Sequence, residues 1–133
     1  MNLEEYRAKC EEILENAERY ANAIHPYLSD YENREIHGSM RFVSATIDEE
    51  GDICILFEDR FRGEVFDDSV YTYDIGDFFT AESTDAEIAS FIEQAEKRKL
   101  EREARIEKKK EDEKAAIEAR ERAELKRLSE KYQ

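Results

Sequence analysis

The side chains that could do chemistry in this chain are its carboxylates, histidines and cysteines, and their spacing decides which chemistry is open to them. The 133 residues include 35 Asp and Glu, two His and two Cys. His25 and His37 stand beside Pro26 and Gly38 and belong to no ligand-spaced or nucleophile motif. With so many carboxylates some pair always resembles an acid/base dyad, so such a pair carries little information. We therefore expect no catalytic residue and no enzyme activity.

A metal site would be expected where oxygens cluster, in the run Asp48–Asp52, DEEGD. This run lacks the alternating ligand order and the closing glutamate of an EF-hand loop, and its neighbours have strand character. The favoured interpretation is a hairpin turn in which Gly51 adopts a positive φ. The four glycines of the chain are isolated from one another, so no glycine-rich phosphate loop is present. We expect no metal and no cofactor.

Charge is the most distinctive feature of the sequence, and it is unevenly distributed. Residues 1–95 carry 24 acids and seven bases, whereas residues 96–133 carry 11 acids and 14 bases. This boundary predicts an acidic domain over 1–95 and a charged helical extension over 96–133. An acidic domain repels nucleic acid and membrane phosphates and attracts basic proteins. We expect a basic protein surface as partner, with no direct nucleic-acid or membrane binding.

The acids are concentrated in a stretch rich in β-branched and aromatic residues, Ser39–Ile75. We predict that its acidic rim, with two tyrosines of the type that anchors interfaces, binds the partner. The predicted partner-binding residues are Asp48, Glu49, Glu50, Asp52, Glu58, Asp59, Glu64, Asp67, Asp68, Tyr71, Tyr73, Asp74 and Asp77. The alternative is an acidic surface that only aids solubility.

The elements that must position these residues give an α+β fold. An N-terminal amphipathic helix is predicted over Asn2–Ile24, with Asn2 as its N-cap, and Pro26 ends it. A connector to Gly38 follows, with one helical turn around Ser29–Arg34. The predicted strands of a three-stranded antiparallel meander are Met40–Ile47, Ile53–Glu58 and Val65–Ile75.

Three details of the meander and the last helix are also predicted. In the first strand, Val43, Ala45 and Ile47 are expected on one face, and a bulge or late start is expected at Asp67-Asp68. A capping box with Thr84 and Glu87 is expected to begin the last helix, whose residues to Ala95 pack on the same sheet face as the first helix.

The remainder of the chain is predicted to be a long charged helix, because it is rich in helix formers and opposite charges recur three or four residues apart. A solvated single helix is favoured over a dimeric coiled coil, because no clean heptads are sustained. Lys97–Lys110 holds eight bases but no aromatic residue for stacking, which disfavours a nucleic-acid interface. The chain is expected to be a monomer or a homodimer.

Cys10 and Cys54 show no metal-like spacing and are expected to be small buried residues in a reducing compartment. No apolar run approaches the roughly 18 residues that span a bilayer, and the N-terminus does not resemble a signal peptide. The expected location is therefore the cytoplasm.

A helix, a small meander (SMRFVSATIDEEGDICILFEDRFRGEVFDDSVYTYDI) and a Glu/Lys/Arg-rich helix together resemble the small accessory proteins of tailed phages and other mobile elements. These include acidic inhibitors of host defence nucleases, some of which imitate the charge of DNA. The resemblance implies a non-enzymatic inhibitor, in the host cytoplasm, that blocks the basic surface of a host nuclease or another nucleic-acid-binding protein. The alternative is a structural or assembly protein, such as a scaffold, that oligomerises through its C-terminal helix.

Overall fold

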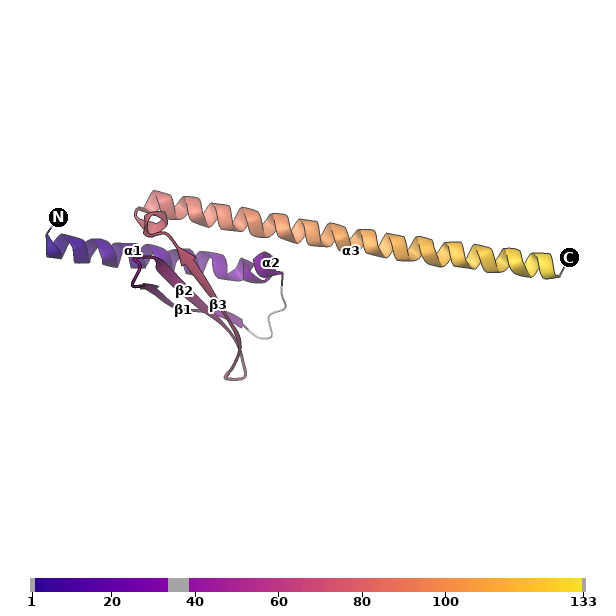
Figure 1. Cartoon of the computed structure of the whole chain (residues 1–133), viewed down its shortest axis with the longest axis horizontal. Coiled ribbons are helices and arrows are strands. Elements are labelled where there is room, and N and C mark those ends of the chain that lie inside the picture. Colours follow the sequence, from indigo (N-terminus) through magenta and orange to yellow (C-terminus); the bar gives the residue numbers. More distant parts are fainter. Residues whose placement is uncertain (1, 34–38, 133) are drawn as a thin grey trace. The chain divides into compact units, whose positions relative to one another are not determined.

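The computed structural model describes residues 2–33 and 39–132 and shows an α+β fold (Figure 1). Its contacts divide the chain into two units, Met1–Arg98 and Lys99–Gln133. The first unit holds a helix, a three-stranded antiparallel sheet and the start of the last helix, as predicted. His37 and the rest of residues 34–38, where the predicted connector ends, lie outside the described residues.

The first helix, α1 (Leu3–Ile24), forms because one of its faces is apolar and its N-terminus is capped. The Asn2 side chain accepts a hydrogen bond of 2.9 Å from the Glu5 amide, which confirms the predicted N-cap. The buried side chains are Ile13, Ala17, Tyr20, Ala21 and Ile24. Two short helices follow, η1 (His25–Tyr27) and α2 (Leu28–Glu32), and α2 supplies the helical turn expected in the connector.

The sheet consists of β1 (Ser39–Ile47), β2 (Ile53–Phe61) and β3 (Glu64–Tyr73) in the order β1-β2-β3. Gly51 has the predicted positive φ, of 84°, in the first turn. The second connection is shorter than predicted, because β2 continues to Phe61 and only Arg62 and Gly63 join it to β3. Their φ values of 54° and 81° fit a tight two-residue hairpin turn.

Each edge strand contains one extra residue opposite β2. The register passes from Phe42↔Phe57 to Ser44↔Leu56, so Val43 is the bulged residue of β1. The predicted alternation of β1 was wrong at Val43, because the bulge leaves this side chain 45% exposed while Ala45 and Ile47 pack against the core. In β3 the extra residue is Phe66, directly before the pair Asp67-Asp68 where a bulge was expected.

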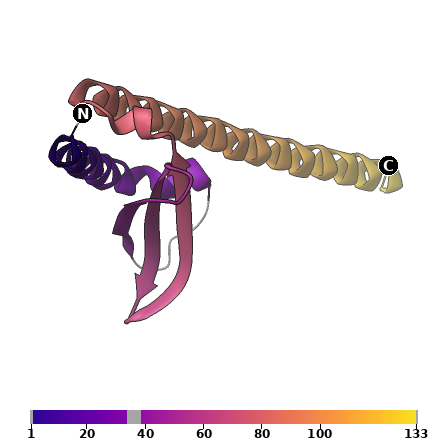
Figure 2. The same cartoon turned by 60° about the vertical axis from the view of Figure 1, so that its left-hand side comes forward.

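The hydrophobic core lies on one face of the sheet, beneath α1 and the first turns of the last helix (Figures 1 and 2). Ile53, Ile55 and Phe57 of β2 are fully buried there. Burying one such side chain contributes about 1.5–3 kcal/mol, so this row holds the sheet to the helices. Alternation places Leu56 of β2 and Val70 of β3 on the opposite face, where Val70 is 61% exposed.

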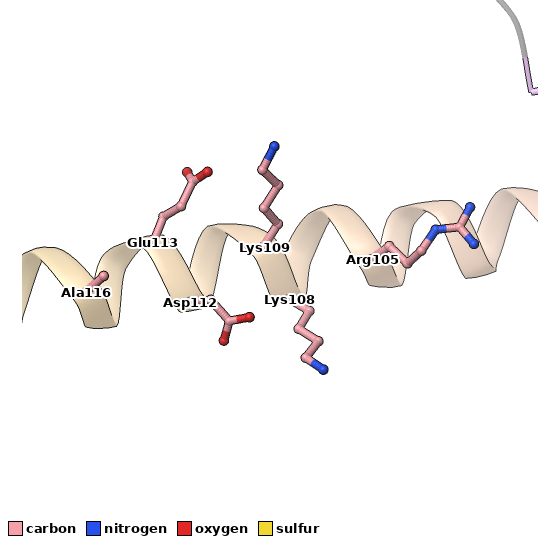
Figure 3. A pocket seen from close by; sticks show the side chains of 6 residues that line it. All are labelled: Arg105, Lys108, Lys109, Asp112, Glu113 and Ala116. Carbon is pink, nitrogen blue, oxygen red and sulfur yellow. The ribbon is translucent and has the colours of Figure 1, made fainter.

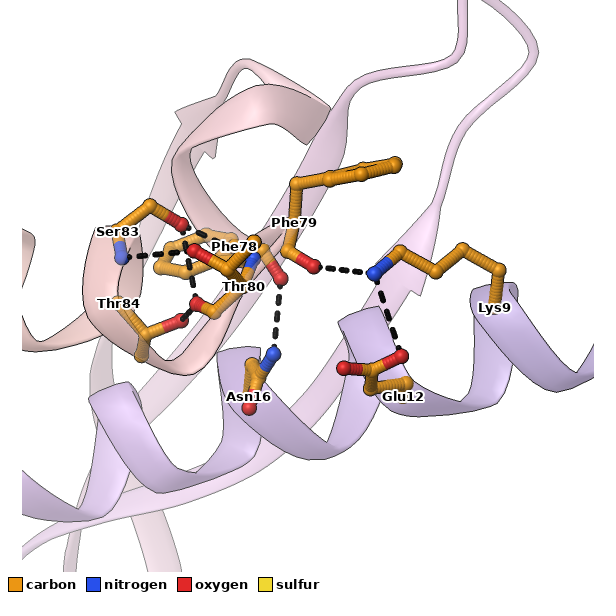
Figure 4. A network of polar contacts seen from close by, with 8 residues as sticks. All are labelled: Lys9, Glu12, Asn16, Phe78, Phe79, Thr80, Ser83 and Thr84. Carbon is orange, nitrogen blue, oxygen red and sulfur yellow. Dashed lines mark hydrogen bonds and ion pairs between the residues drawn. The ribbon is translucent and has the colours of Figure 1, made fainter.

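The last helix, α3 (Ala81–Lys131), follows the short helix η2 (Ile75–Phe78) and begins before the predicted Thr84 cap. The Ser83 amide donates to the Thr80 hydroxyl and the Thr80 amide donates to the Ser83 hydroxyl, at 3.0 and 3.1 Å (Figure 4). Thr84 is instead fully buried in the first turn and donates to the Thr80 carbonyl. The predicted box with Glu87 was therefore wrong, because Thr80 and Ser83 already satisfy each other's amides.

One flank of α1 holds the segment that leads into α3. Asn16 donates a hydrogen bond to the Phe78 carbonyl, and Lys9 donates one to the Phe79 carbonyl, at 3.0 and 2.6 Å (Figure 4). Arg19 forms an ion pair of 2.6 Å with Asp85 in the first turns of α3. The bonds from Asn16 and Lys9 satisfy carbonyls at the end of η2, and together with the ion pair they fix where α3 begins.

The second unit, Lys99–Gln133, consists of the continuation of α3. Of its described residues, 99–132, only Arg102 is partly buried and the others are exposed. The predicted opposite-charge pairing is present at Glu124 and Arg127, whose side chains lie 2.5 Å apart. Pairs of this kind stabilise a solvated helix by about 0.2–0.5 kcal/mol each. No helix in the described part of the chain is both long and apolar enough to cross a membrane.

Candidate functional site

The predicted acidic rim falls into two groups at opposite ends of the sheet. We call the first the turn end: the β1–β2 turn Asp48–Asp52 together with Asp74 and Asp77, which follow β3. The second, the hairpin end, consists of Glu58, Asp59, Glu64, Asp67 and Asp68 on the β2–β3 hairpin. About 16 Å of strand separates Ile53 from Glu58 at roughly 3.3 Å per residue. The predicted acidic rim therefore forms two separate surfaces, one at each end of the sheet.

At the turn end, several carboxylates bind the backbone of their own chain. The Asp48 side chain accepts hydrogen bonds of 2.9 Å from the amides of Glu50 and Asp52. The Asp52 amide is the largest cause that holds the pKa of the Asp48 carboxyl below its ordinary value. The thiol of Cys54, one of two free and half-buried cysteines, also donates to Asp48, at 3.5 Å. Asp48 therefore stabilises the turn.

The acids after β3 also have local structural contacts. The Asp74 side chain caps η2 by accepting a bond of 3.1 Å from the Gly76 amide. Burial, with a further contribution from the Asp77 carboxylate, raises the pKa of Glu87 in α3. Within the turn Asp48–Asp52, Glu49 and Glu50 are the exposed acids, whereas Asp48 and Asp52 are partly buried.

At the hairpin end, acids face acids across the strands. Glu58 is opposite Asp68, and Asp59 is opposite Asp67, in two consecutive cross-strand pairs. Like charges directly opposite each other destabilise a sheet. Arg60 forms an ion pair of 2.8 Å with Glu58 and offsets part of this repulsion. The pair of Glu58 and Asp68 thus carries a local electrostatic cost.

Three predicted partner-binding residues lie on the core face of the sheet, one of them fully buried and two partly buried. Asp59 is fully buried on the core face of the sheet, and Tyr71 and Tyr73 point toward the helices. The Tyr71 ring packs edge-on against Phe57 and Phe91, and the Tyr73 hydroxyl lies 2.6 Å from that of Tyr20. Strand alternation explains this, because Tyr71 and Tyr73 share the face of the buried Ser69. These three side chains are not part of the exposed acidic surface.

Burial of the tyrosines has an electrostatic consequence. Loss of solvent raises the pKa of Tyr73 to about 12. It also raises the pKa of Tyr20 and Tyr71, and the Glu32 carboxylate adds to the effect at Tyr71. A small cavity of about 90 Å³ lies between these rings and α3, lined by Tyr20, Tyr31, Tyr73, Glu87, Ser90, Phe91 and Gln94. A cavity of this volume suits water and excludes a larger substrate.

The hairpin end also exposes apolar side chains that the sequence reasoning missed. Every residue from Arg60 to Asp68 is exposed, and Figures 1 and 2 show this hairpin projecting away from the helices. Phe61, Val65 and Phe66 are 41%, 49% and 48% exposed, and the two rings lie 6.1 Å apart. Grouped exposed aromatic residues indicate an interaction surface. The Arg-Gly turn between Phe61 and Phe66 was the signal that could have shown that the strands continue so far.

No metal centre is assembled in the described part of the chain. Within residues 2–33 and 39–132, no three His, Cys, Asp or Glu side chains group in a way that could hold a metal ion. A surface hollow on the second unit is lined by Arg105, Lys108, Lys109, Asp112, Glu113 and Ala116. Figure 3 shows that Lys109 and Glu113 point to one side of the helix and Lys108 and Asp112 to the other, so they enclose no site.

Comparison of the chain with protein families, with curated proteins and with solved structures found no match.

Proposed function

We propose that the chain is a non-enzymatic protein-binding module whose hairpin end occupies a basic, nucleic-acid-binding surface of another protein and blocks it. It would act in the manner of the acidic phage and mobile-element inhibitors that it resembles, with a host nuclease or another nucleic-acid-binding protein as target. The observation that carries the proposal is the combination of exposed aromatic side chains with acids on one projecting hairpin.

The chemistry of the hairpin end matches such a partner in two ways. Phe61, Val65 and Phe66 supply apolar area that gains free energy when a partner removes it from water. Glu64, Asp67 and Asp68 surround this area with exposed negative charge, which steers a basic surface toward it and repels nucleic acid. A protein surface that binds phosphates through Lys and Arg is complementary to both features.

The partner is tested by affinity capture with the full-length chain from cells that encode it, at low and high salt. The charge-reversed hairpin variant Asp67→Lys/Asp68→Lys is compared with the matched turn-end variant Glu49→Lys/Glu50→Lys. Both variants exchange two adjacent exposed acids for lysines, so they change net charge equally.

The proposal expects capture of a basic nucleic-acid-binding protein by the native chain and by the turn-end control, weakened at high salt and lost with the hairpin variant. Equal capture by the two variants, or a captured protein without a basic surface, would contradict it.

A second candidate function is assembly through the second unit. Ile117, Leu125, Leu128 and Tyr132 are exposed at 50%, 70%, 37% and 76% near the end of α3. A second helix that covers these side chains would remove their apolar area from water, although the chain sustains no regular heptads. Light scattering on the native chain and on Leu125→Ser/Leu128→Ser separates the two functions, because assembly predicts a native oligomer that the variant dissociates. A native monomer would exclude this candidate.

A further inference from the structure

A second open surface lies along the β1 edge of the sheet. β1 pairs with β2 on one side, and no strand in residues 2–33 and 39–132 pairs with its other side. Proteins usually protect such an edge with charged residues, proline or a bulge. Among its nine residues β1 has one charged side chain, Arg41, and its bulge at Val43 leaves Ser44–Ile47 in regular pairing with β2.

The register shows which backbone groups of this stretch point outward. The Asp48 amide donates to the Asp52 carbonyl at 2.9 Å, so hydrogen-bonded pairs alternate from this point along the two strands. Thr46 is then bonded to Cys54, whereas the amides and carbonyls of Ala45 and Ile47 point away from β2. These are the groups that an added strand would bind.

A groove of about 480 Å³ runs beside the same stretch, between α1 and β1. Leu14 and Val43 contribute apolar surface, and Val43 is exposed because of the bulge. The groove is lined by Glu11, Leu14, Glu15, Glu18, Phe42, Val43, Ser44 and Ala45. The opposite flank of α1 is already engaged by Lys9 and Asn16 with the start of α3, so this flank is the free one.

The charge of the groove selects its occupant. Glu11, Glu15 and Glu18 lie on one flank of α1, and the lining contains no basic residue. None of the three is in an ion pair with a described residue. A second copy of the chain, paired edge to edge through β1, would bring its own three glutamates against this wall, which like-charge repulsion opposes.

We propose that an extended, basic segment of a partner protein adds to β1 at Ser44–Ile47 as a fourth strand. Its backbone binds the outward groups of Ala45 and Ile47. Alternate side chains of the segment divide between the two faces of the enlarged sheet, so lysines or arginines on one face meet the glutamates of α1. This interaction is independent of the hairpin end and of the function proposed for it.

The probe is an eight-residue peptide of alternating lysine and valine, added to the full-length chain and followed by fluorescence anisotropy at about 50 mM salt, where surface charges are weakly screened. A peptide with four lysines followed by four valines has the same composition without the alternation. The charge variant is Glu11→Gln/Glu15→Gln/Glu18→Gln, and its matched control is Glu4→Gln/Glu49→Gln/Glu50→Gln, three exposed acids outside the groove.

We expect the alternating peptide to bind, and the groove variant to bind it about tenfold more weakly, since three exposed ion pairs are lost. The control variant should bind like the native chain. Ala45→Pro removes an outward amide and should abolish binding, whereas Ala45→Gly keeps that amide and should bind. Hydrogen exchange of the native chain should slow at the Ala45 and Ile47 amides when the peptide is present. This measurement uses the native chain, so it does not depend on whether the proline variant folds.

The proposal is overturned if the alternating peptide does not bind, or if the two peptides bind equally. It is also overturned if the groove variant and its control lose affinity equally, because binding would then report overall charge. Unchanged exchange at Ala45 and Ile47 excludes strand addition, and a native dimer held through β1 would identify a second copy as the occupant.

Discussion

The two ends of the sheet carry similar charge and use it differently. At the turn end, the Asp48 and Asp74 carboxylates accept hydrogen bonds from nearby amides, and the Tyr20–Tyr73 pair lies beneath the last residues of β3. At the hairpin end, Asp67 and Asp68 face other acids, and Phe61 and Phe66 are exposed beside them. The two ends differ chiefly in the exposed apolar side chains that accompany the acids, because Asp67 at the hairpin end also accepts a hydrogen bond, of 2.8 Å, from the Asp68 amide.

The difference shows which residues serve the fold. A carboxylate that accepts amide hydrogen bonds stabilises its turn, and its removal leaves those donors unsatisfied. A carboxylate opposite another carboxylate, as Asp68 is opposite Glu58, adds repulsion that opposes pairing of the strands. Removal of a carboxylate should therefore have opposite effects on stability at the two ends.

The largest expected effect contrasts two phenylalanines of β2, one in the core and one on the projecting hairpin. Phe57→Ala should lower the free energy of unfolding by about 3–5 kcal/mol, because Phe57 is fully buried and its loss creates a cavity. Phe61→Ala should change it by about 0.5 kcal/mol or less, since its ring is exposed. Denaturant unfolding of both variants checks this, and a large loss for Phe61→Ala would show that the hairpin belongs to the core.

High pH should weaken the region beneath the turn end. Tyr73 ionises at its ordinary value of 10.0 when unfolded but at about 12 when folded, so the unfolded chain loses its proton first. Its contribution to stability is complete below pH 10 and is lost as the pH rises through about 12. Denaturant unfolding across this range should show the decline, and Tyr73→Phe should make it less steep, while Tyr20 and Tyr71 still contribute. The exposed control Tyr6→Phe should decline like the native chain. An equal slope in Tyr73→Phe and Tyr6→Phe would contradict this assignment.

Removal of the turn carboxylate should destabilise the chain moderately. Asp48→Ala leaves the amides of Glu50 and Asp52 without their acceptor and should lower the thermal midpoint by a few degrees. Glu49→Ala in the same turn is the control, because the Glu49 side chain is exposed. Equal midpoints for the two variants would remove the structural role assigned to Asp48.

The smallest effect is expected at the hairpin end, with the opposite sign. Asp68→Asn removes one charge of the pair with Glu58 and should raise the free energy of unfolding by about 0.2–1 kcal/mol. The same substitution should weaken partner binding. Loss of stability in Asp68→Asn, measured by denaturant unfolding, would show that this acid supports the fold after all.

Much of the fold could be predicted from the sequence, because local patterns determine it. The apolar stripe of α1, the Asn2 cap and the positive φ of Gly51 depend on residues a few positions apart. The bulges at Val43 and Phe66 could not be predicted, since they depend on pairing with β2. The start of α3 was misplaced because two capping motifs lie in succession, and burial of Thr84 decides between them.

The candidate site was predictable in composition but not in arrangement. The acids could be read from the sequence, whereas their division between two ends follows from the register of the strands. Tyr71 and Tyr73 were expected at the surface because their type is common in interfaces, yet strand alternation turns them to the core. Phe61 and Phe66 were not among the predicted partner-binding residues, and they are exposed because the hairpin projects beyond the core.

The central claim is that the hairpin end blocks a basic nucleic-acid-binding surface, and displacement tests it most directly. Full-length chain is titrated into a complex of the captured partner with its nucleic acid, and release is followed by fluorescence anisotropy. The account predicts that the native chain and Glu49→Lys/Glu50→Lys release the nucleic acid, whereas Asp67→Lys/Asp68→Lys does not. Release by all three chains, or by none, would contradict it.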